Sequence, residues 1–322
     1  MLRRNRCAKL RCKRTLVDEF ELIRRFFDRG GAAAGVVTGI GDDGAILDPS
    51  PGTEQIQVID TLVEGVHFPH DTDAADIGYR VVAVNLSDIA AMGGRPRWMT
   101  LALTLPPKEE RWVDDFASGL FAAAREFDVA LVGGDMTGGE NVVATIHMTG
   151  EIARGAALLR SGAQEGDTIY VSGTCGDAAA GLELLQRGTP DDLLAERFLR
   201  PRARIELGSC LAGRASAAID VSDGLVGDLG KLLQASNVGG EIDIDKVPVS
   251  AALTQRFDKA DAIRFALTGG DDYELCFTAC EGGLAGIDDI TAIGRVIAGD
   301  GLTCLRDGAV VEYEASGYRH FA

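Results

Sequence analysis

Apolar residues recur at the spacing of an α-helix in three segments of the first half of the chain. Residues 17–29 place three phenylalanines and an isoleucine along one side. Residues 73–94 carry a longer pattern of the same kind, which a glycine pair closes, and residues 108–127 carry the third. Repeats of three and four residues predict amphipathic helices, and glycine commonly follows a helix end. We therefore expect three helices in this half.

Short runs of apolar and β-branched residues separate these segments. Such runs predict strands, because their side chains pack well on a pleated surface. A hairpin that ends at residues 58–68 precedes the second helix. Further strands of this half are expected at residues 97–106, 129–135 and 141–153.

The alternation of strands and helices starts afresh after Gly155. Helices are expected at residues 176–188, 200–213 and 223–236, and strands at residues 167–173 and 217–222. The C-terminal third is expected to be mainly strands, at residues 241–245, 274–279, 290–297 and 303–313. The pattern predicts an α/β (α+β) protein with mixed sheets and two domains, residues 16–154 and 155–322.

The loop at residues 38–52, TGIGDDGAILDPSPG, contains three glycines spaced G-x-G-x-x-G, as in dinucleotide-binding loops. That motif needs a following helix whose N-terminus faces the phosphates. Here two prolines and a glycine within four residues exclude a helix and favour strand, turn and strand. Asp42 and Asp43 would also repel a phosphate. We interpret the segment as a flexible loop that offers carboxylates to a cation.

The composition, 46% hydrophobic and 25% charged over 322 residues, is that of an ordinary globular protein. The net charge of −17 argues against nucleic acid as a partner, because phosphate contacts need basic surface. No apolar run approaches the ~18 residues of a membrane span, so no membrane contact is expected. The seven cysteines include no C-x-x-C pair, which favours reduced thiols in a cytoplasmic protein.

Residues 1–15 carry seven basic side chains and no acidic one. They lack the apolar core of a secretory signal. We expect a disordered tail, or an extension from an upstream start codon, that lies outside the fold. An arm that binds a polyanion is the alternative.

Aspartates recur at strand ends and glycine-rich turns, where side chains from separate strands can converge. Besides the pair in the loop, they are Asp60, Asp135, Asp220 and Asp223. Oxygen ligands contributed by several elements are the set that Mg²⁺ prefers in proteins. The positions therefore suggest a shared cation site.

Asp88 differs from the others because it lies inside the helix expected at residues 73–94. Helical spacing puts it on one face with Val81, Val84, Asn85 and Met92. An aspartate on an apolar face is costly unless it is paired or binds a metal. A local cap or salt bridge would satisfy it, but a hard cation explains the pattern better.

The familiar nucleotide and hydrolase motifs are absent from the sequence. No P-loop occurs, and the nearest match, GDLGKLL, lacks both the hydroxyl and the preceding glycine. The kinase H-R-D set, the G-x-S-x-G elbow and H-E-x-x-H are also missing. A bound nucleotide is therefore expected to be held through metal bridged by carboxylates.

Seven motifs occur in an order that resembles the thiamine-monophosphate kinases. They are GIGDDGA, DTLVEGVHF, NLSDIAAMGG, VGGDMTGG, RSGAQEGD, IDVSDGL and GGDDYEL. The resemblance runs from about residue 17 to the final SGYRHF. Seven ordered motifs are a far stronger signal than any one of them.

The resemblance implies the fold of the aminoimidazole-ribonucleotide synthetase-like superfamily. Two α/β domains would enclose an ATP site in the cleft between them, and a homodimer would form through the N-terminal domains. The implied activity is ATP- and Mg²⁺-dependent phosphorylation of thiamine monophosphate to thiamine diphosphate. The alternatives are another ATP-dependent enzyme of the superfamily and a non-catalytic protein that binds nucleotide or cation.

Two relatives within the superfamily fit the sequence less well. Selenophosphate synthetase would need a reactive Cys or selenocysteine near Gly44, and none lies beside it. The hydrogenase-maturation relative needs a C-terminal cysteine, whereas the sequence ends HFA. The kinase is therefore the expectation.

The resemblance also implies roles for individual residues. It places several Mg²⁺ ions on Asp43, Asp60, Asp88, Asp135, Asp220 and Asp223. It places ATP against Gly134, Asp135, Arg160 and Ser222. It places the thiamine phosphate against His67, Asp271 and Tyr318.

Three positions depart from the usual family pattern. Ile59 stands where a threonine usually precedes the aspartate of DTLVEG, so a hydroxyl ligand is lost. Met136 replaces the first threonine after VGGD. Asp271 is one methylene shorter than the usual glutamate, so its carboxylate has less reach.

The reaction would need no catalytic side chain acting as a base. A phosphate monoester is mostly a dianion at pH 7, because its second pKa is about 6. The obstacle is repulsion among roughly six negative charges, which Mg²⁺ ions on a ring of carboxylates would offset while aligning the reactants. Arg160 could neutralise phosphate charge directly, and an aromatic face such as that of Tyr318 suits the flat, cationic thiamine rings.

Overall fold

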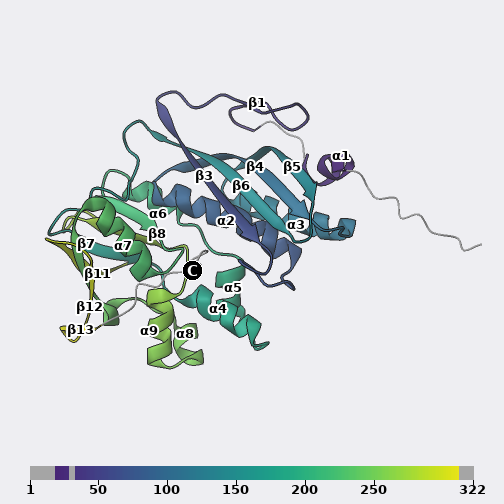
Figure 1. Cartoon of the computed structure of the whole chain (residues 1–322). Helices are drawn as coiled ribbons and strands as arrows, with labels where there is room; N and C mark the ends of the chain where they lie inside the picture. Colours follow the sequence, from purple (N-terminus) through teal and green to yellow (C-terminus); the bar gives the residue numbers. More distant parts are fainter. Residues whose placement is uncertain (1–18, 29–32, 312–322) are drawn as a thin grey trace, which may run out of the picture.

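A computed structural model describes residues 19–28 and 33–311 of the chain. The basic residues 1–15 and Tyr318, to which the sequence assigns roles, lie outside the described residues. The two large sheets, each with its own helices, lie side by side in Figure 1, the N-terminal sheet at the upper right and the C-terminal sheet at the lower left. Within the described ranges, no helix has both the length and the apolar character that a membrane span requires.

The N-terminal sheet has four strands in the order β3-β6-β4-β5. Their bounds are β3 (Thr53–Val63), β6 (Val143–Ala153), β4 (Arg95–Leu105) and β5 (Ala130–Gly138). The first three run antiparallel, while β4 and β5 are parallel. A parallel pair needs a crossover connection, and α3 (Glu110–Glu126) supplies it. This arrangement leaves one face of the sheet for helices and the other open.

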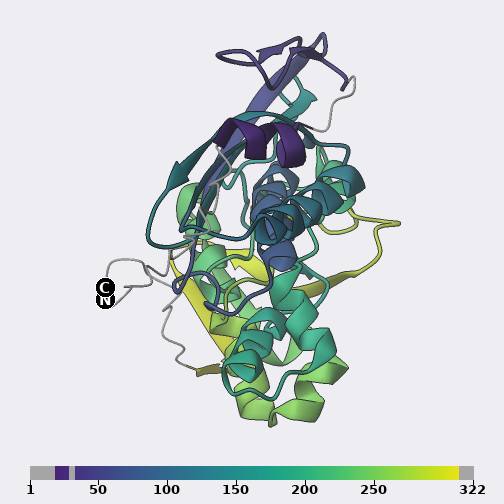
Figure 2. The same ribbon diagram turned by 90° about the vertical axis from the view of Figure 1, so that its right-hand side faces the viewer.

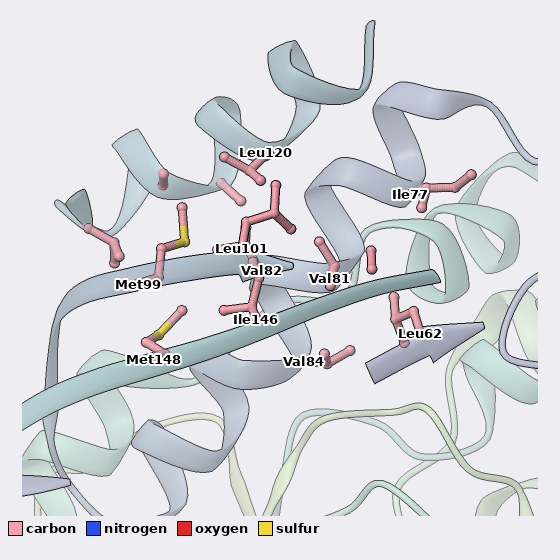
Figure 3. Packing of buried hydrophobic residues seen from close by; sticks show 14 of the residues in the cluster. Leu62, Ile77, Val81, Val82, Val84, Met99, Leu101, Leu120, Ile146 and Met148 are labelled. Atoms are coloured by element: carbon pink, nitrogen blue, oxygen red, sulfur yellow. The ribbon is translucent and has the colours of Figure 1, made fainter. Parts of the chain in front are cut away.

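Two helices cover one face of this sheet, α3 and α2 (Ala74–Ala91). Figure 3 shows their apolar side chains meeting those of the strands, among them Val81, Leu101, Leu120 and Ile146. The helices cross very closely, because a Cβ on Gly119 would lie only 1.8 Å from the carbonyl oxygen of Ala75. The two long helices of the sequence analysis are thereby confirmed within a few residues.

The first expected helix is shorter and less regular than predicted. α1 (Glu19–Leu22) continues as a π-helical segment, η1 (Ile23–Phe27). Phe26 and Phe27 are buried in the core of the N-terminal domain, whereas Phe20 is 77% exposed. The apolar spacing identified the buried face correctly only for the second half of the segment.

The glycine-rich loop lies between two short strands, β1 (Val36–Thr38) and β2 (Ile46–Leu47), which pair antiparallel. The next element is β3, so no helix follows the glycines. The expected order of strand, turn and strand is confirmed, and the dinucleotide-binding interpretation is excluded.

The C-terminal domain is built on a seven-stranded mixed sheet in the order β13-β12-β9-β11-β7-β10-β8. In chain order its strands are β7 (Thr168–Ser172), β8 (Ala217–Asp220), β9 (Gly239–Asp243), β10 (Leu275–Ala279), β11 (Ile290–Ile297), β12 (Leu302–Arg306) and β13 (Ala309–Val311). Its helices are α4 (Asp177–Gln186), α5 (Asp192–Leu199), α6 (Ile205–Leu211), α7 (Leu225–Ser236), η2 (Ile244–Lys246), α8 (Ala251–Arg256) and α9 (Lys259–Thr268).

Three features of this domain differ from the sequence expectation. The helix expected at residues 200–213 is only α6, because residues 201–204, which begin with Pro201, are not helical. The helix α5 was not expected. The C-terminal third also contains α8 and α9, so the prediction of mainly strands is wrong there. Ser250 and Asp258 cap these two helices with their side chains, and such N-cap residues are a signal that could have revealed them.

The helix α2 connects the two domains. Ala90 and Ala91 in its last turn pack with Leu211 of α6 and Phe277 of β10 in one buried cluster. The helix also contacts both β3 and β8. Its C-terminal half therefore lies between the two sheets, and the residues it carries there face both domains. Figure 2 shows the same stacking of the domains from the side.

Candidate active site

Three aspartates from three elements meet at the junction of the domains. Asp60 lies on β3, and strand alternation gives it the same face as the buried Ile56 and Leu62, beneath α2. Asp88 lies in the last turn of α2, and its side chain hydrogen-bonds that of Asp60. Asp220 ends β8 and is buried. The sequence predicted a cation site shared by six aspartates, and the fold brings these three of them together.

The electrostatics of these carboxylates show how close they are. Burial raises the pKa of Asp60 to about 6, with a further contribution from Asp220. Burial and then Asp60 raise the pKa of Asp88 to about 7. Burial and then Asp88 raise the pKa of Asp220 to about 7. Burying three carboxylates beside one another costs free energy, and a bound cation would offset that cost. The site is therefore a candidate for binding cations.

Two neighbouring groups act on the cluster. The hydroxyl of Ser87 donates to Oδ2 of Asp220 at 2.9 Å, so the residue before Asp88 on α2 orients an aspartate of the other domain. Arg160 is exposed, and its charge opposes the rise in pKa of Asp88 and of Asp220. The sequence assigned Arg160 to ATP, and the structure brings it near the carboxylates.

The loop between β8 and α7 carries Ser222 and Asp223. The buried carboxylate of Asp228 accepts the backbone N–H groups of Ser222 at 3.0 Å and of Asp223 at 2.9 Å. Lys231 bridges the loop and the helix, with Nζ 2.6 Å from Asp223 and 2.8 Å from Asp228. The charge of Asp223 also acts on Asp60. The loop is therefore held at the edge of the cluster.

The side chains of residues 271–274 form many of the polar contacts beside the cluster. Arg80 Nη2 donates to Oδ1 of Asp271 at 2.5 Å. Asp272 is buried and accepts the N–H of Gly176 at 2.7 Å, which satisfies the N-terminus of α4. Only Asp271 in this segment has a role predicted from the sequence; the partners of Asp272 and Glu274 come from distant segments.

Glu274 is fully buried and pairs with two arginines. Arg204 donates to both of its carboxylate oxygens, from Nε at 2.6 Å and from Nη2 at 2.7 Å. Arg197 adds a contact of 2.6 Å, and the hydroxyl of Ser172 donates at 2.5 Å. The network joins α5, β7 and β10 behind the Asp271 segment and fixes the position of that segment.

His67 follows β3 and is half-buried. Its Nδ1 accepts the backbone N–H of Val63 at 3.0 Å. An imidazole that accepts at Nδ1 and is neutral carries its proton on Nε2, which makes Nε2 a donor. The assignment of His67 to a phosphate-bearing substrate fits this tautomer, and it stays a prediction.

The structure does not bring Asp135 to the cluster. β5 is three strands from β3, about 14 Å away at the usual strand spacing. Asp135 pairs with the exposed Ala102 and lies on the open face of the sheet, whereas Asp60 lies on the helix-covered face. Gly134 precedes it at a point where the β5 backbone closely approaches that of Leu101. Roles for Gly134 and Asp135 remain predictions.

Asp43 is also apart from the cluster in this structure. It is exposed, in the loop between β1 and β2. That ribbon is attached where β3 begins, since Ser50 bonds Glu151 on the neighbouring strand, and Asp60 lies seven residues further along, about 23 Å. In both views the ribbon is at the top, away from the C-terminal domain (Figures 1 and 2).

The donor set around Asp60, Asp88 and Asp220 fits Mg²⁺. All of its ligand atoms are oxygens, which Mg²⁺ prefers. The raised pKa values of the three carboxylates indicate that a bound positive charge would be favourable there. As the side chains stand, however, the described residues contain no group of three acidic, His or Cys side chains that could hold a metal by themselves. This combination is typical of Mg²⁺, which keeps several waters and completes its coordination with substrate phosphates.

Comparisons with known proteins agree with this arrangement. Residues 41–152 match the family model of the AIR synthase related protein, N-terminal domain. Residues 164–305 match the C-terminal domain model of the same family. Together these cover most of the chain, and their boundary falls between β6 and β7.

Several similar full-length proteins are thiamine-monophosphate kinases. The thiamine-monophosphate kinase of Salmonella typhimurium is 47% identical over 321 residues, covering 94% of this chain and 98% of its own. The crystal structure of thiamine-monophosphate kinase from Stenotrophomonas maltophilia superposes with a TM-score of 0.84 at 44% identity, covering 91% of this chain and 98% of that one. AaThiL complexed with AMPPCP and TMP superposes with a TM-score of 0.78 at 37% identity, covering 88% and 92%.

Proposed function

The chain belongs to the thiamine-monophosphate kinase family of AIR synthase related proteins, and we propose that it transfers the γ-phosphate of ATP to thiamine monophosphate. The observation that carries the proposal is the cluster of Asp60, Asp88 and Asp220 at the junction of the domains. It is the kind of site that a reaction between two phosphate-bearing substrates requires.

We propose that these three aspartates and Asp223 hold Mg²⁺ when the substrates are bound. Mg²⁺ there would neutralise charge on the phosphates and hold them in line. Asp43 and Asp135 would join only if their segments move, or if another copy of the chain supplies them. Arg160 lies close enough to act on two of the aspartates, and it supplies positive charge beside an ATP phosphate.

The residues near the cluster suit a reaction without a general base. The nucleophile is the phosphate dianion of the acceptor, which needs no deprotonation near pH 7. The Nδ1 atom of His67 is already occupied by the Val63 amide. His67 therefore binds the acceptor phosphate through Nε2–H instead of removing a proton from it.

The choice of acceptor tests this function. Thiamine offers a hydroxyl in place of the dianion, so under a mechanism without a general base we expect its turnover to be at least about 100-fold below that of thiamine monophosphate. The two acceptors should be compared side by side at saturating ATP and Mg²⁺. His67→Ala should raise KM for thiamine monophosphate with a smaller change in kcat, the mark of lost uniform binding. Equal turnover of both acceptors would contradict the assignment.

We also propose that the protein is a homodimer formed by the open face of the four-stranded sheet. Gln55, Gln57, Ile59 and Thr61 alternate along β3 on that face, and all four are exposed. Ile59, which is 64% exposed, offers a partner an apolar side chain in the middle of this strand. A two-fold axis would bring this face against its own copy.

The oligomeric state is open to direct measurement. Light scattering at micromolar concentration should give the mass of a dimer, and Ile59→Asp should shift it towards a monomer because it buries a charge at the interface. Val310→Asp, at a 70% exposed position of the C-terminal domain, is the matched control. A monomeric wild-type protein at this concentration would contradict the proposal.

A further inference from the structure

Arg80 is a charged side chain buried between the domains. It lies on α2, and its side chain is only 2% exposed. Burying a guanidinium costs several kcal/mol unless its donors are satisfied. Its partners belong to the C-terminal domain: Nη1 donates to the carbonyl oxygen of Phe198, and Nη2 donates to Oδ1 of Asp271 at 2.5 Å.

Two aromatic rings hold the guanidinium in place. Its carbon lies 4.2 Å from the centroid of Phe198 and 5.8 Å from that of Tyr273. Stacking and a planar donor fork together leave Arg80 little freedom. No hydrogen-bond partner for its Nε occurs in the described ranges, so its directed contacts are those that reach Phe198 and Asp271.

Asp271 is held at the same oxygen by a second donor. The hydroxyl of Tyr273 donates to Oδ1 at 3.1 Å, and burial raises the pKa of Tyr273 well above its usual value, so the phenol remains a donor. The backbone is constrained too, since φ is 70° at Asp271 and 51° at Tyr273. Two non-glycine residues in the left-handed region cost of order 1 kcal/mol each or more, and they persist only where the surroundings impose them.

The second oxygen of Asp271 has a different environment. Among residues 19–28 and 33–311, no group donates a hydrogen bond to Oδ2, and the side chain is 31% exposed. The N–H of Asp271 donates to the carbonyl oxygen of Ser222 at 2.8 Å, which places this carboxylate beside the loop that carries Asp223. A fixed, partly exposed acceptor therefore stands next to the candidate site.

We propose that Arg80 is a positioning residue for the acceptor substrate: it fixes Oδ1 of Asp271 so that Oδ2 can accept a hydrogen bond from thiamine monophosphate. The exocyclic amine of the aminopyrimidine is a donor of the required kind. This inference rests on the proposed function.

A double-mutant cycle separates this role from a structural one. Arg80→Met and Asp271→Asn should each raise the Kd and KM of thiamine monophosphate by about 10- to 100-fold, the range for a hydrogen bond to a charged group. The double variant should be no worse than the poorer single variant, since both changes remove one contact. KM for ATP should change less than threefold. Calorimetry with thiamine monophosphate gives the Kd without turnover.

Three further variants complement the double-mutant cycle. Arg80→Lys keeps the charge but not the fork, so it should remain impaired, and it replaces Arg80→Met if that variant does not fold. Tyr273→Phe removes only the second donor and should have a smaller effect of the same kind. Arg200→Met is the matched control, because Arg200 pairs with Asp76 on the same helix at 2.6 Å without touching Asp271.

Each unfavourable result has one meaning. The positioning role would be overturned if the losses of affinity for thiamine monophosphate were additive in the double variant, or if KM rose equally for thiamine monophosphate and ATP. Either result would leave the proposed function in place. Wild-type affinity in Arg80→Lys would show that the fork geometry is not needed, and would also overturn it. A wild-type protein that neither binds nor phosphorylates thiamine monophosphate would overturn the proposed function and this inference with it.

Discussion

Replacing Asp88 with asparagine should lower kcat/KM for thiamine monophosphate by about 10²- to 10³-fold while the protein stays folded. The charge that Mg²⁺ contributes to phosphoryl transfer is worth several kcal/mol, and each 1.4 kcal/mol is a factor of ten in rate. Asp88 shares a hydrogen bond with Asp60 and acts on Asp220, so its charge is central to the cluster.

Stability should respond in the opposite direction from activity. The three carboxylates repel one another in the metal-free protein, so Asp88→Asn should leave its melting temperature unchanged or raise it. Added Mg²⁺ should stabilise the wild-type protein, because a ligand that binds only the native state shifts the melting temperature. That shift should be reduced in the variant.

Asp76→Asn is the control for this experiment. Asp76 lies on the same helix but pairs with Arg200 away from the cluster. It should keep both the activity and the response to Mg²⁺. Full activity in Asp88→Asn with a normal Mg²⁺ response would show that the cluster is not the metal site.

Glu274→Ala should lower the free energy of unfolding by about 3–5 kcal/mol. The substitution leaves Arg197 and Arg204 buried without their common partner, and breaking a buried ion pair on one side carries that cost. At about 2–4 °C for each kcal/mol, the melting temperature should fall by roughly 6–20 °C. Chemical denaturation gives the free energy and differential scanning calorimetry the temperature.

A surface ion pair gives the comparison. Arg295 is 70% exposed and pairs with Glu241 at 2.8 Å, and Arg295→Gln should change stability by less than about 1 kcal/mol. A similar loss in both variants would mean that burial does not set the cost. An unchanged free energy of unfolding in Glu274→Ala would mean that the two arginines find other partners.

Most of the architecture follows from local patterns. The helices α2 and α3 have long amphipathic repeats, and the strands β3 to β6 are apolar runs bounded by turn residues. These signals are strong because each repeat covers several turns or a whole strand. The helices α5 and α8 have eight and six residues, too few for a clear period, whereas the signal missed for α9 was its N-cap, Asp258.

Asp88 shows what a helical pattern in the sequence can predict about the site and what it cannot. An acidic residue on an otherwise apolar helix face indicated a partner from elsewhere, and the structure supplies Asp60 from β3 and Asp220 from β8. The helical period placed Asp88 on an apolar face, and burying a charge on such a face costs free energy. The residue was therefore recognisable as unusual from the sequence. It did not show which carboxylates would lie beside it.

The sequence by itself determined the long elements, the two-domain organisation, the exclusion of a dinucleotide loop and the candidate residues. The tertiary structure alone decided which candidates meet. Strand order and side-chain alternation put Asp60 and Asp135 on opposite faces of one sheet, and a buried Arg80 reaches Asp271 across 191 residues of chain. Contacts of that kind depend on how elements pack in space, and no local period in the sequence records them.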